Sequence, residues 1–488
     1  MVRLTCPKTL RYFKDVYLTA LTLHSYRSPD MSAQVDRRFF LRSSLAAASL
    51  PLVARLALAA DSSHQQSAYE DQRTAWFRAA KFGMFIHWGP YSVASVEASW
   101  PIMRPGQWGV TETEYRALPA RFNPVHFDPD HFIDMARTAG QKYMVFTTKH
   151  HDGFCMFDSD YTSYKITNMP YGKDIVKQLA DACFRRSMPL GFYYSPPDMH
   201  HPGFRDTSRA ASENWNGQPE RPEWSSYLQY MQLQLTELLT RYGDVRDIWF
   251  DGLNHQEKYD GRRFLDLIHR LQPATLVNDR IGVPGDYVTP EQFIPRAIPT
   301  KGVEVRGADD SVQKDFHAGV PSPADFQLWE TCMTINDTWA YNAHDHHFKS
   351  SRDLIRGLVE VASRGGNFLL NVGPQPDGMI QPEFQERLRA IGDWITINGD
   401  SIYETSYGPV QGQSAYRTTA KGSELYVHIF DWPSNSLTIT GLPAKVLSAR
   451  LLANNQPLRF EQTAGTLSIT LPPQPPDANV SVVAFRML

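Results

Sequence analysis

The sequence DIWFDG at residues 247–252 is the most informative stretch of this chain, because it joins a short apolar run to an acid and a glycine. The apolar run predicts a buried strand that ends at Asp251, and Gly252 then frees the backbone to turn away. A carboxylate at the end of a buried strand is where a (β/α) barrel places its reacting groups. The alternative is that Asp251 only caps the next helix, since such caps are common at strand-to-helix turns.

Other predicted strands end in polar and aromatic residues of the same kind, which favours the first interpretation. In a parallel barrel, the carboxyl ends of all strands lie on one face, so these groups would gather there. The segments concerned are FIHWG 85–89, KHHDG 149–153, YYSP 193–196, WFDG 249–252, NDR 278–280 and WET 329–331.

Strand-like and helix-like runs alternate through the central part of the chain. This alternation is typical of βαβ units with a parallel sheet. We therefore expect a (β/α)8-like, TIM-type barrel over residues 65–402, whose regularity the sequence leaves open. The predicted strands are residues 83–87, 143–148, 190–194, 247–251, 275–278, 327–330 and 367–372, and the predicted helices are 174–186, 223–242, 352–363 and 382–397.

Near residue 405 the pattern changes to short alternating strands, predicted at 424–430, 436–439, 466–471 and 480–485. Such strands, separated by turn residues, indicate a small antiparallel β-sandwich over residues 405–488. None of its residues suggests catalysis. Covering one side of the barrel is the favoured role, and carbohydrate binding is the alternative.

The N-terminus has the pattern of an export signal. Residues 1–60 are expected to be an extension and a cleavable signal with a probable start at Met31, a twin-arginine-like pair at 37–38, an apolar core at 45–54 and small residues at 57–60. The apolar core is too short to span a membrane, so we expect no stable membrane anchor. The protein would then be exported and periplasmic or secreted.

Composition limits the classes of partner. The 49 basic and 52 acidic side chains give a net charge of −3, which argues against a nucleic-acid surface. Aromatic residues make up 12% of the chain, and tryptophan suits the apolar faces of sugar rings, although large cores also use it. Cys155, Cys183 and Cys332 do not have the spacing of a zinc site. We expect no metal and no cofactor.

The motifs resemble those of the family 29 glycoside hydrolases, the α-L-fucosidases, and occur in order over about residues 76–400. The matching segments are WF 76–77, KFGMFIHWG 81–89, TTKHHDGF 147–154, GKD 172–174, GFYYS 191–195, WFDG 249–252, WETC 329–332 and GGNFLLNVGP 365–374. The resemblance implies an irregular barrel followed by a sandwich. It also implies an exo-acting, retaining enzyme that removes terminal fucose from fucosylated oligosaccharides or glycoconjugates through a covalent intermediate.

The resemblance also implies roles for individual residues. Asp251 would be the nucleophile, kept ionised by a nearby cation such as Arg280. Other residues would bind the sugar or line its pocket: His87, Glu97, Trp100, His150, His151, Tyr194, Trp249 and Arg280.

The acid/base position varies within this family, and two glutamates compete for it. Glu291 is the first choice, because it follows the fifth strand in a segment that a mobile loop could bring to the leaving group. Glu330 is the rival, because the sequence predicts it at a strand end. The alternative role for Glu330 is to shape the pocket through an ion pair or a hydrogen bond.

Two other classes stay open at this point. One is a non-catalytic fucose- or carbohydrate-binding protein on the same scaffold. The other is a metal-dependent hydrolase using His87, His150, His151 and Asp152, although adjacent residues on a strand point to opposite sides unless the chain turns. The insertion at 198–224 would shape the aglycone site, and an oligomer is compatible with the sequence.

Overall fold

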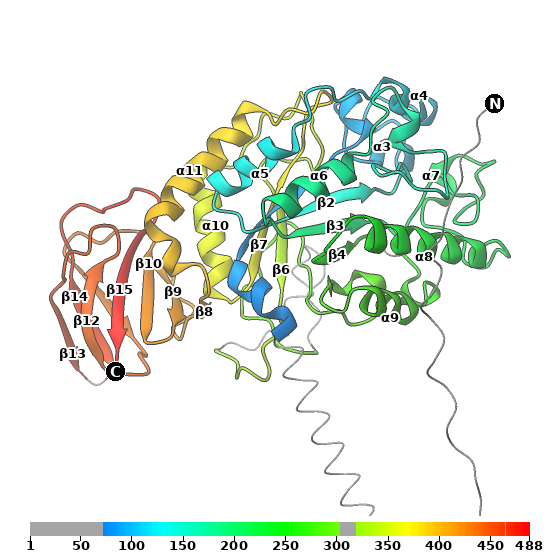
Figure 1. The fold of residues 1–488 in the computed structure, drawn as a ribbon. Helices are drawn as coiled ribbons and strands as arrows, with labels where there is room; N and C mark the ends of the chain where they lie inside the picture. Colours follow the sequence, from blue (N-terminus) through cyan, green and yellow to red (C-terminus); the bar gives the residue numbers. More distant parts are fainter. Residues whose placement is uncertain (1–71, 253, 303–318, 464) are drawn as a thin grey trace, which may run out of the picture. The chain divides into compact units, whose positions relative to one another are not determined.

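Seven parallel strands form a curled sheet in the order β5-β4-β3-β2-β1-β7-β6 (Figure 1). The computed structural model describes residues 72–252, 254–302, 319–463 and 465–488, so the predicted signal and start lie outside the described residues. The strands are β1 Phe82–Ile86, β2 Tyr143–Lys149, β3 Leu190–Tyr194, β4 Asp247–Phe250, β5 Leu276–Val277, β6 Glu330–Thr334 and β7 Asn367–Val372.

An irregular segment closes the sheet between β5 and β6. Tyr287 bridges to Asn278 after β5, while Val288 bridges to Trp329 and Glu291 to Cys332 of β6. The predicted barrel is thus confirmed, with this segment in the place of a regular eighth strand.

Helices cover the outer face of the curled sheet (Figure 1). Their sequences explain where they begin: Asp174 and Ser350 accept hydrogen bonds from backbone N–H groups of the first turns of α6 and α10. The longer helices are α5 Pro129–Thr138, α6 Ile175–Arg185, α8 Trp224–Arg241, α9 Gly261–Leu271, α10 Ser351–Ser363 and α11 Pro382–Asn398, and the short ones are α3 Trp100–Met103, α4 Glu112–Ala117 and α7 Ala211–Asn214. None of the described helices combines the length and the apolar character needed to cross a membrane.

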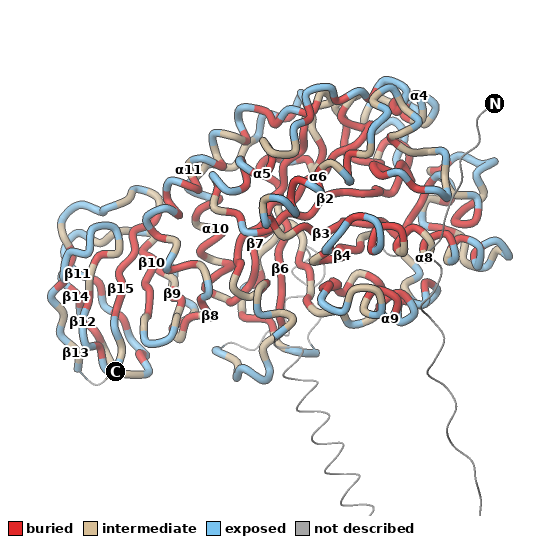
Figure 2. Tube along the Cα trace, in the orientation of Figure 1, coloured by how far each residue is buried: buried red, intermediate tan, exposed pale blue. Residues whose placement is uncertain are grey.

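Alternation along the strands divides the core in two. On β4, Ile248 and Phe250 pack toward the helices, whereas Trp249 packs inside the barrel with Phe85 and Tyr193. The strands are buried along their length and the outer helix faces are exposed (Figure 2). The same two-residue period carries Asp251 inward at the end of β4.

The sixth strand was predicted wrongly. The expected strand at 327–330 is instead β6 at Glu330–Thr334, so Glu330 begins the strand rather than ending it. It pairs with Asn367, the first residue of β7. The physical reason is that β6, besides pairing with β7, is bridged on its other side by the irregular segment from Val288 to Glu291, which the apolar pattern of the sequence does not reveal.

The C-terminal strands form a five-stranded sheet, β12-β15-β10-β9-β8, and a three-stranded sheet, β11-β14-β13. An apolar cluster that includes Val427, Ile439 and Leu467 lies between them. The described residues from 72 to 488 form one compact unit, and Trp394 of α11 donates through Nε1 to Val480 O at 2.8 Å. The strands are β8 Ser406–Tyr407, β9 Tyr416–Lys421, β10 Glu424–Ile429, β11 Ser436–Thr440, β12 Val446–Leu451, β13 Phe460–Thr463, β14 Thr466–Thr470 and β15 Ser481–Met487, of which β8, β9, β12 and β13 were not predicted.

Candidate active site

A cavity of about 580 Å³ lies at the carboxyl ends of the barrel strands. This volume is within the range of about 300–1,000 Å³ that small-molecule sites occupy. The predicted site residues that line it are His87, Glu97, Trp100, His150, His151, Trp249, Asp251, Arg280 and Glu291.

Asp251 directly follows β4 and faces this cavity. Its Oδ2 accepts a hydrogen bond from the Tyr193 hydroxyl at 2.8 Å, and its Oδ1 accepts one from Arg280 Nη1 at 2.6 Å. Burial would raise the pKa of Asp251, but the charge of Arg280, the neighbouring His151 and the two hydrogen bonds outweigh burial and lower it. Gly252 has φ +77°, and a Cβ there would lie 2.5 Å from the His151 ring, so this turn requires glycine.

Arg280 connects Asp251 with the preferred acid/base candidate. Its Nη1 also donates to Glu291 Oε2 at 2.8 Å. The two carboxylate oxygens therefore cannot be farther apart than the sum of their distances to this nitrogen. That upper limit is compatible with the carboxyl separation of about 5–5.5 Å in retaining glycosidases and is shorter than the roughly 6.5–9.5 Å of inverting ones.

The backbone around Glu291 is not the free loop that the sequence suggested. Gln292 N donates to Cys332 O at 2.9 Å, and Cys332 N donates to Pro290 O at 3.2 Å, so β6 holds this segment. The Glu291 side chain nevertheless remains 38% exposed. It is therefore held at its backbone and open to solvent at its carboxyl group.

Three histidines form a polar wall of the cavity, each held through Nδ1. The Nδ1 atoms lie 2.7 Å from Asn371 Oδ1 for His87, 2.7 Å from Ser99 Oγ for His150 and 2.6 Å from Ser195 Oγ for His151. Nε2 is then the nitrogen available to a ligand. Burial lowers the pKa of His87 to about 4 and also lowers the pKa values of His150 and His151, so all three are neutral near pH 7.

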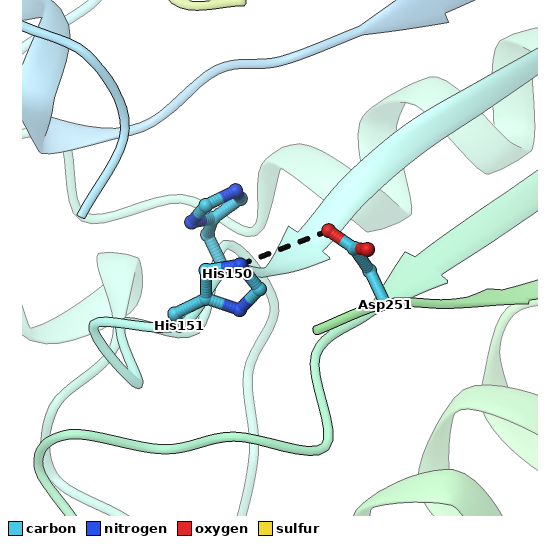
Figure 3. Close-up of side chains that lie close together, drawn as sticks. All are labelled: His150, His151 and Asp251. Atoms are coloured by element: carbon cyan, nitrogen blue, oxygen red, sulfur yellow. Dashed lines mark ion pairs between the residues drawn. The ribbon is translucent and has the colours of Figure 1, made fainter. Parts of the chain in front are cut away.

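The chain turns after β2, and this brings His150 and His151 to the same cavity as Asp251 (Figure 3). His151 Nε2 lies 3.7 Å from Asp251 Oδ2. Ligand atoms of these three residues lie within 4.8 Å of one another, which is the spacing of a metal site. Arg280 already brings a positive charge to Asp251, which disfavours a second cation there.

Asp152, the fourth residue of the metal-hydrolase alternative, does not join this group. It is buried and accepts hydrogen bonds from the Tyr115 hydroxyl at 2.8 Å and from Phe154 N at 3.0 Å. It is also absent from the cavity lining. That alternative therefore lacks the ligand set the sequence suggested.

Glu97 and Trp100 both line the cavity, as expected. The Glu97 carboxylate accepts from the backbone N–H groups of Ala98 at 3.0 Å, Trp339 at 2.8 Å and Ala340 at 3.3 Å. Burial raises the pKa of Glu97 to about 7, although these hydrogen bonds oppose the shift. Glu97 thus joins the loop before α3 to the loop after β6.

Glu330, the rival acid/base candidate, is not among the residues that line the cavity, whereas Glu291 is. It is buried inside the barrel, where it accepts hydrogen bonds from Trp249 Nε1 at 3.0 Å and from the Tyr143 hydroxyl. Burial raises its pKa to about 7. Glu330 begins β6 and so lies at the amino end of that strand, away from the carboxyl ends where the cavity lies.

Tyr194 was expected to line the pocket, and this prediction is wrong. Its side chain packs outside the barrel, where the hydroxyl donates to Gln234 Oε1 of α8 at 2.9 Å. Alternation along β3 instead turns Tyr193 inward to Asp251. The sequence offers two adjacent tyrosines, and only the register of β3 distinguishes them.

Sequence reasoning also missed Trp339, Asn371, Ser99 and Ser195. Trp339 lines the cavity, with its ring centroid 4.9 Å from that of His87. Ser99 has φ +61°, a conformation that costs energy in a residue other than glycine and is frequent at functional sites. The one available signal was a polar residue at the end of a predicted strand. Ser195, which directly follows β3, has that position.

Comparisons with known proteins agree with this geometry. The model of the alpha-L-fucosidase family matches residues 53–400. The human plasma alpha-L-fucosidase is 28% identical over 434 residues, which cover 80% of this chain and 83% of that protein.

Solved structures show the same similarity. Alpha-L-fucosidase isoenzyme 1 from Paenibacillus thiaminolyticus has a TM-score of 0.75 and 34% identity, covering 86% of this chain and 99% of that one. A GH29 alpha-L-fucosidase from Bacteroides thetaiotaomicron, trapped as a covalent intermediate, has a TM-score of 0.72 and 27% identity, covering 86% and 96%. From its barrel, its cavity and these matches, the chain belongs to the alpha-L-fucosidase family of glycoside hydrolases.

Proposed function

We propose that this protein is a retaining exo-α-L-fucosidase that hydrolyses terminal fucose from fucosylated oligosaccharides or glycoconjugates. The observation that carries the proposal is the sharing of Arg280 Nη1 by Asp251 and Glu291. It brings one ionised carboxylate and one partly exposed carboxyl group to the spacing that double displacement requires.

In the first step, Asp251 attacks the anomeric carbon, and the bond from this carbon to the leaving oxygen breaks. Glu291 gives its proton to that oxygen. In the second step, Glu291 takes a proton from water, the water oxygen attacks the anomeric carbon, and the ester to Asp251 breaks. Arg280 and Tyr193 keep Asp251 ionised and oriented before the attack.

The rest of the cavity suits a deoxy sugar. Neutral His87, His150 and His151 offer Nε2 to hydroxyl groups, and Glu97 offers a carboxylate. Phe85 and Trp249 supply apolar surface for a C5 methyl group. We assign these contacts to residues 65–402 and a covering role to residues 405–488, and we infer that the protein is exported.

Hydrolysis of p-nitrophenyl α-L-fucoside tests the proposal. We expect Asp251→Ala to lower kcat by several orders of magnitude, because the nucleophile is lost. Glu291→Ala should also lower kcat, and azide should restore part of its activity because azide needs no general base. Glu257→Ala is the matched control, since Glu257 is an exposed acid of the neighbouring 3-10 helix Gln256–Lys258 and does not line the cavity.

Further measurements separate the mechanism from its alternatives. The first sugar product seen by NMR should be the α-anomer, as retention requires. Activity should be unchanged by EDTA. A β-anomer as the first product would contradict double displacement, and activity lost on EDTA treatment and restored by a divalent metal would favour the metal alternative.

A further inference from the structure

The insertion between β3 and α8 forms a fixed wall of the cavity. Pro197, Met199 and Trp215 of this insertion line it. Met199 N donates to His151 O at 2.8 Å, and Met199 O accepts from Arg205 Nε at 2.7 Å. The insertion is therefore joined by its backbone to one of the histidines of the site.

Arg205 holds Trp215 as well as Met199. Its guanidinium is buried, and Nη1 donates to Asn214 Oδ1 at 3.2 Å, directly before Trp215. The other end of α7 is held by Ala211 N, which donates to Glu112 Oε2 at 2.8 Å. Trp215 is thus positioned before any ligand binds, which lowers the entropic cost of using it.

The indole of Trp215 packs against the main core on one side, is partly exposed, and has an unused donor. Among the described residues, no ring contacts it and no acceptor takes its Nε1–H, although that nitrogen is not buried. Most other tryptophans of the chain donate to a carbonyl or carboxylate; those that do are Trp88, Trp224, Trp249, Trp329, Trp394 and Trp432. Trp100, Trp215 and Trp339 keep an accessible N–H, and all three line this cavity.

Burial divides the cavity into two ends. His87, His150, His151 and Glu97 are buried, whereas Trp100, Trp215 and Glu291 are partly exposed. A terminal sugar that occupies the buried polar end must direct its leaving group toward the exposed end. Glu291, which would protonate the leaving oxygen, lies at that end with 38% of its side chain exposed.

We propose that Trp215 and Trp100, backed by the buried Met199, form a leaving-group subsite whose indole rings stack on the apolar face of the pyranose ring next to fucose. This inference rests on the proposed function, because it needs fucose at the buried end. A pyranose ring presents C–H groups on a face and hydroxyl groups at its edge. The indole face matches the first, and the free Nε1–H matches the second.

Two substrates with different leaving groups test the subsite. α-L-Fucosyl fluoride has a single-atom leaving group that cannot reach Trp215, whereas p-nitrophenyl α-L-fucoside has a flat ring that can stack on it. For Trp215→Ala, we expect the ratio of kcat/KM for the nitrophenyl substrate to that for the fluoride to fall about tenfold, equivalent to about 1.4 kcal/mol. Trp108→Ala is the matched control, because Trp108 does not line the cavity, and it should keep the wild-type ratio.

The outcomes are distinct. An unchanged ratio in Trp215→Ala, or an equal loss with both substrates in a variant that keeps the wild-type melting temperature, would overturn the subsite. Wild-type protein that hydrolyses neither substrate would overturn the proposed function and the subsite with it. A Trp215→Phe variant, which keeps a ring but lacks the N–H, should recover most of the ratio if stacking dominates.

Discussion

Arg280 is the residue on which the charge state of the site depends. Its guanidinium is bonded to both Asp251 and Glu291 and lies over the Trp249 ring at 4.8 Å. An arginine in this position stabilises the ionised carboxylate of Asp251, and the contacts with both acids raise its own pKa even though burial opposes this. Asp251 is therefore held in its ionised form at neutral pH.

Arg280→Gln should move the acidic limb of the pH dependence of kcat/KM to higher pH. The reason is that burial, which raises the pKa of Asp251, is then opposed only by His151 and Tyr193. Since kcat/KM reports ionisations of the free enzyme, a pH profile with p-nitrophenyl α-L-fucoside measures the shift. An acidic limb that stays in place would mean that another group controls it.

Glu330 is buried inside the barrel, and its position predicts an effect on stability. Its pKa is raised to about 7 by burial, so the folded protein holds a proton that the unfolded chain releases above about pH 4.5. The free energy of unfolding contributed by this group therefore falls as pH rises from about 4.5 to about 7.

Glu330→Gln removes that dependence. We expect the variant to gain about 1–3 kcal/mol relative to wild type between pH 5 and pH 8 in urea unfolding, while azide does not change its activity. Glu97→Gln is the comparison variant. Burial raises the pKa of Glu97 to about 7, as it does for Glu330, but Glu97 lines the cavity and Glu330 does not. If azide instead restored the activity of Glu330→Ala while Glu291→Ala stayed fully active, Glu330 would be the acid/base.

At the scale of elements, a buried ion pair joins β2 to the insertion. Lys149 Nζ donates to Asp198 Oδ2 at 3.0 Å, and neither side chain is exposed by more than 1%. Asp198 Oδ1 accepts from the backbone N–H groups of His200 at 3.0 Å and His201 at 2.9 Å. The pair thus fixes where the insertion leaves the sheet, one residue before Met199.

Asp198→Asn should destabilise the protein by about 3–5 kcal/mol, because it leaves the Lys149 charge buried without its partner. Asp181→Asn is the matched control. Asp181 pairs with Lys177 on the exposed face of α6, where such a pair contributes only about 0.3–0.5 kcal/mol. Urea unfolding measures both, and equal effects of the two substitutions would contradict this account.

The strands that the sequence predicted best are those with continuous apolar runs, since β3 and β7 have the predicted bounds. Strand β6 was misplaced, because it carries polar residues whose partners, such as Tyr143 and Trp249, come from distant parts of the chain.

The strand ends predicted the cavity and most of its lining. They could not predict Trp339, which reaches the cavity through a loop held by Glu97.

At the scale of the whole molecule, the barrel and the C-terminal sheets should unfold together in one transition. One apolar cluster contains both barrel residues and Val480 and Val482 next to and within β15. Arg417 of β9 also forms an ion pair with Glu360 of α10, in which both side chains are mostly buried. If either the barrel or the C-terminal sheets unfolded alone, the other would be left with exposed apolar surface and an unpaired charge.

A substitution far from the cavity tests this coupling. Val427 is buried in the cluster between the two C-terminal sheets, and Val427→Ala should cost about 2 kcal/mol through the lost methyl groups and the space they leave. If unfolding is cooperative, calorimetry should show one peak that moves to lower temperature, and the loss of fucosidase activity should move with it by the same amount. Two calorimetric peaks, with activity that survives the first, would mean that the sandwich unfolds independently and that the contacts of Trp394 and Arg417 do not couple it to the barrel.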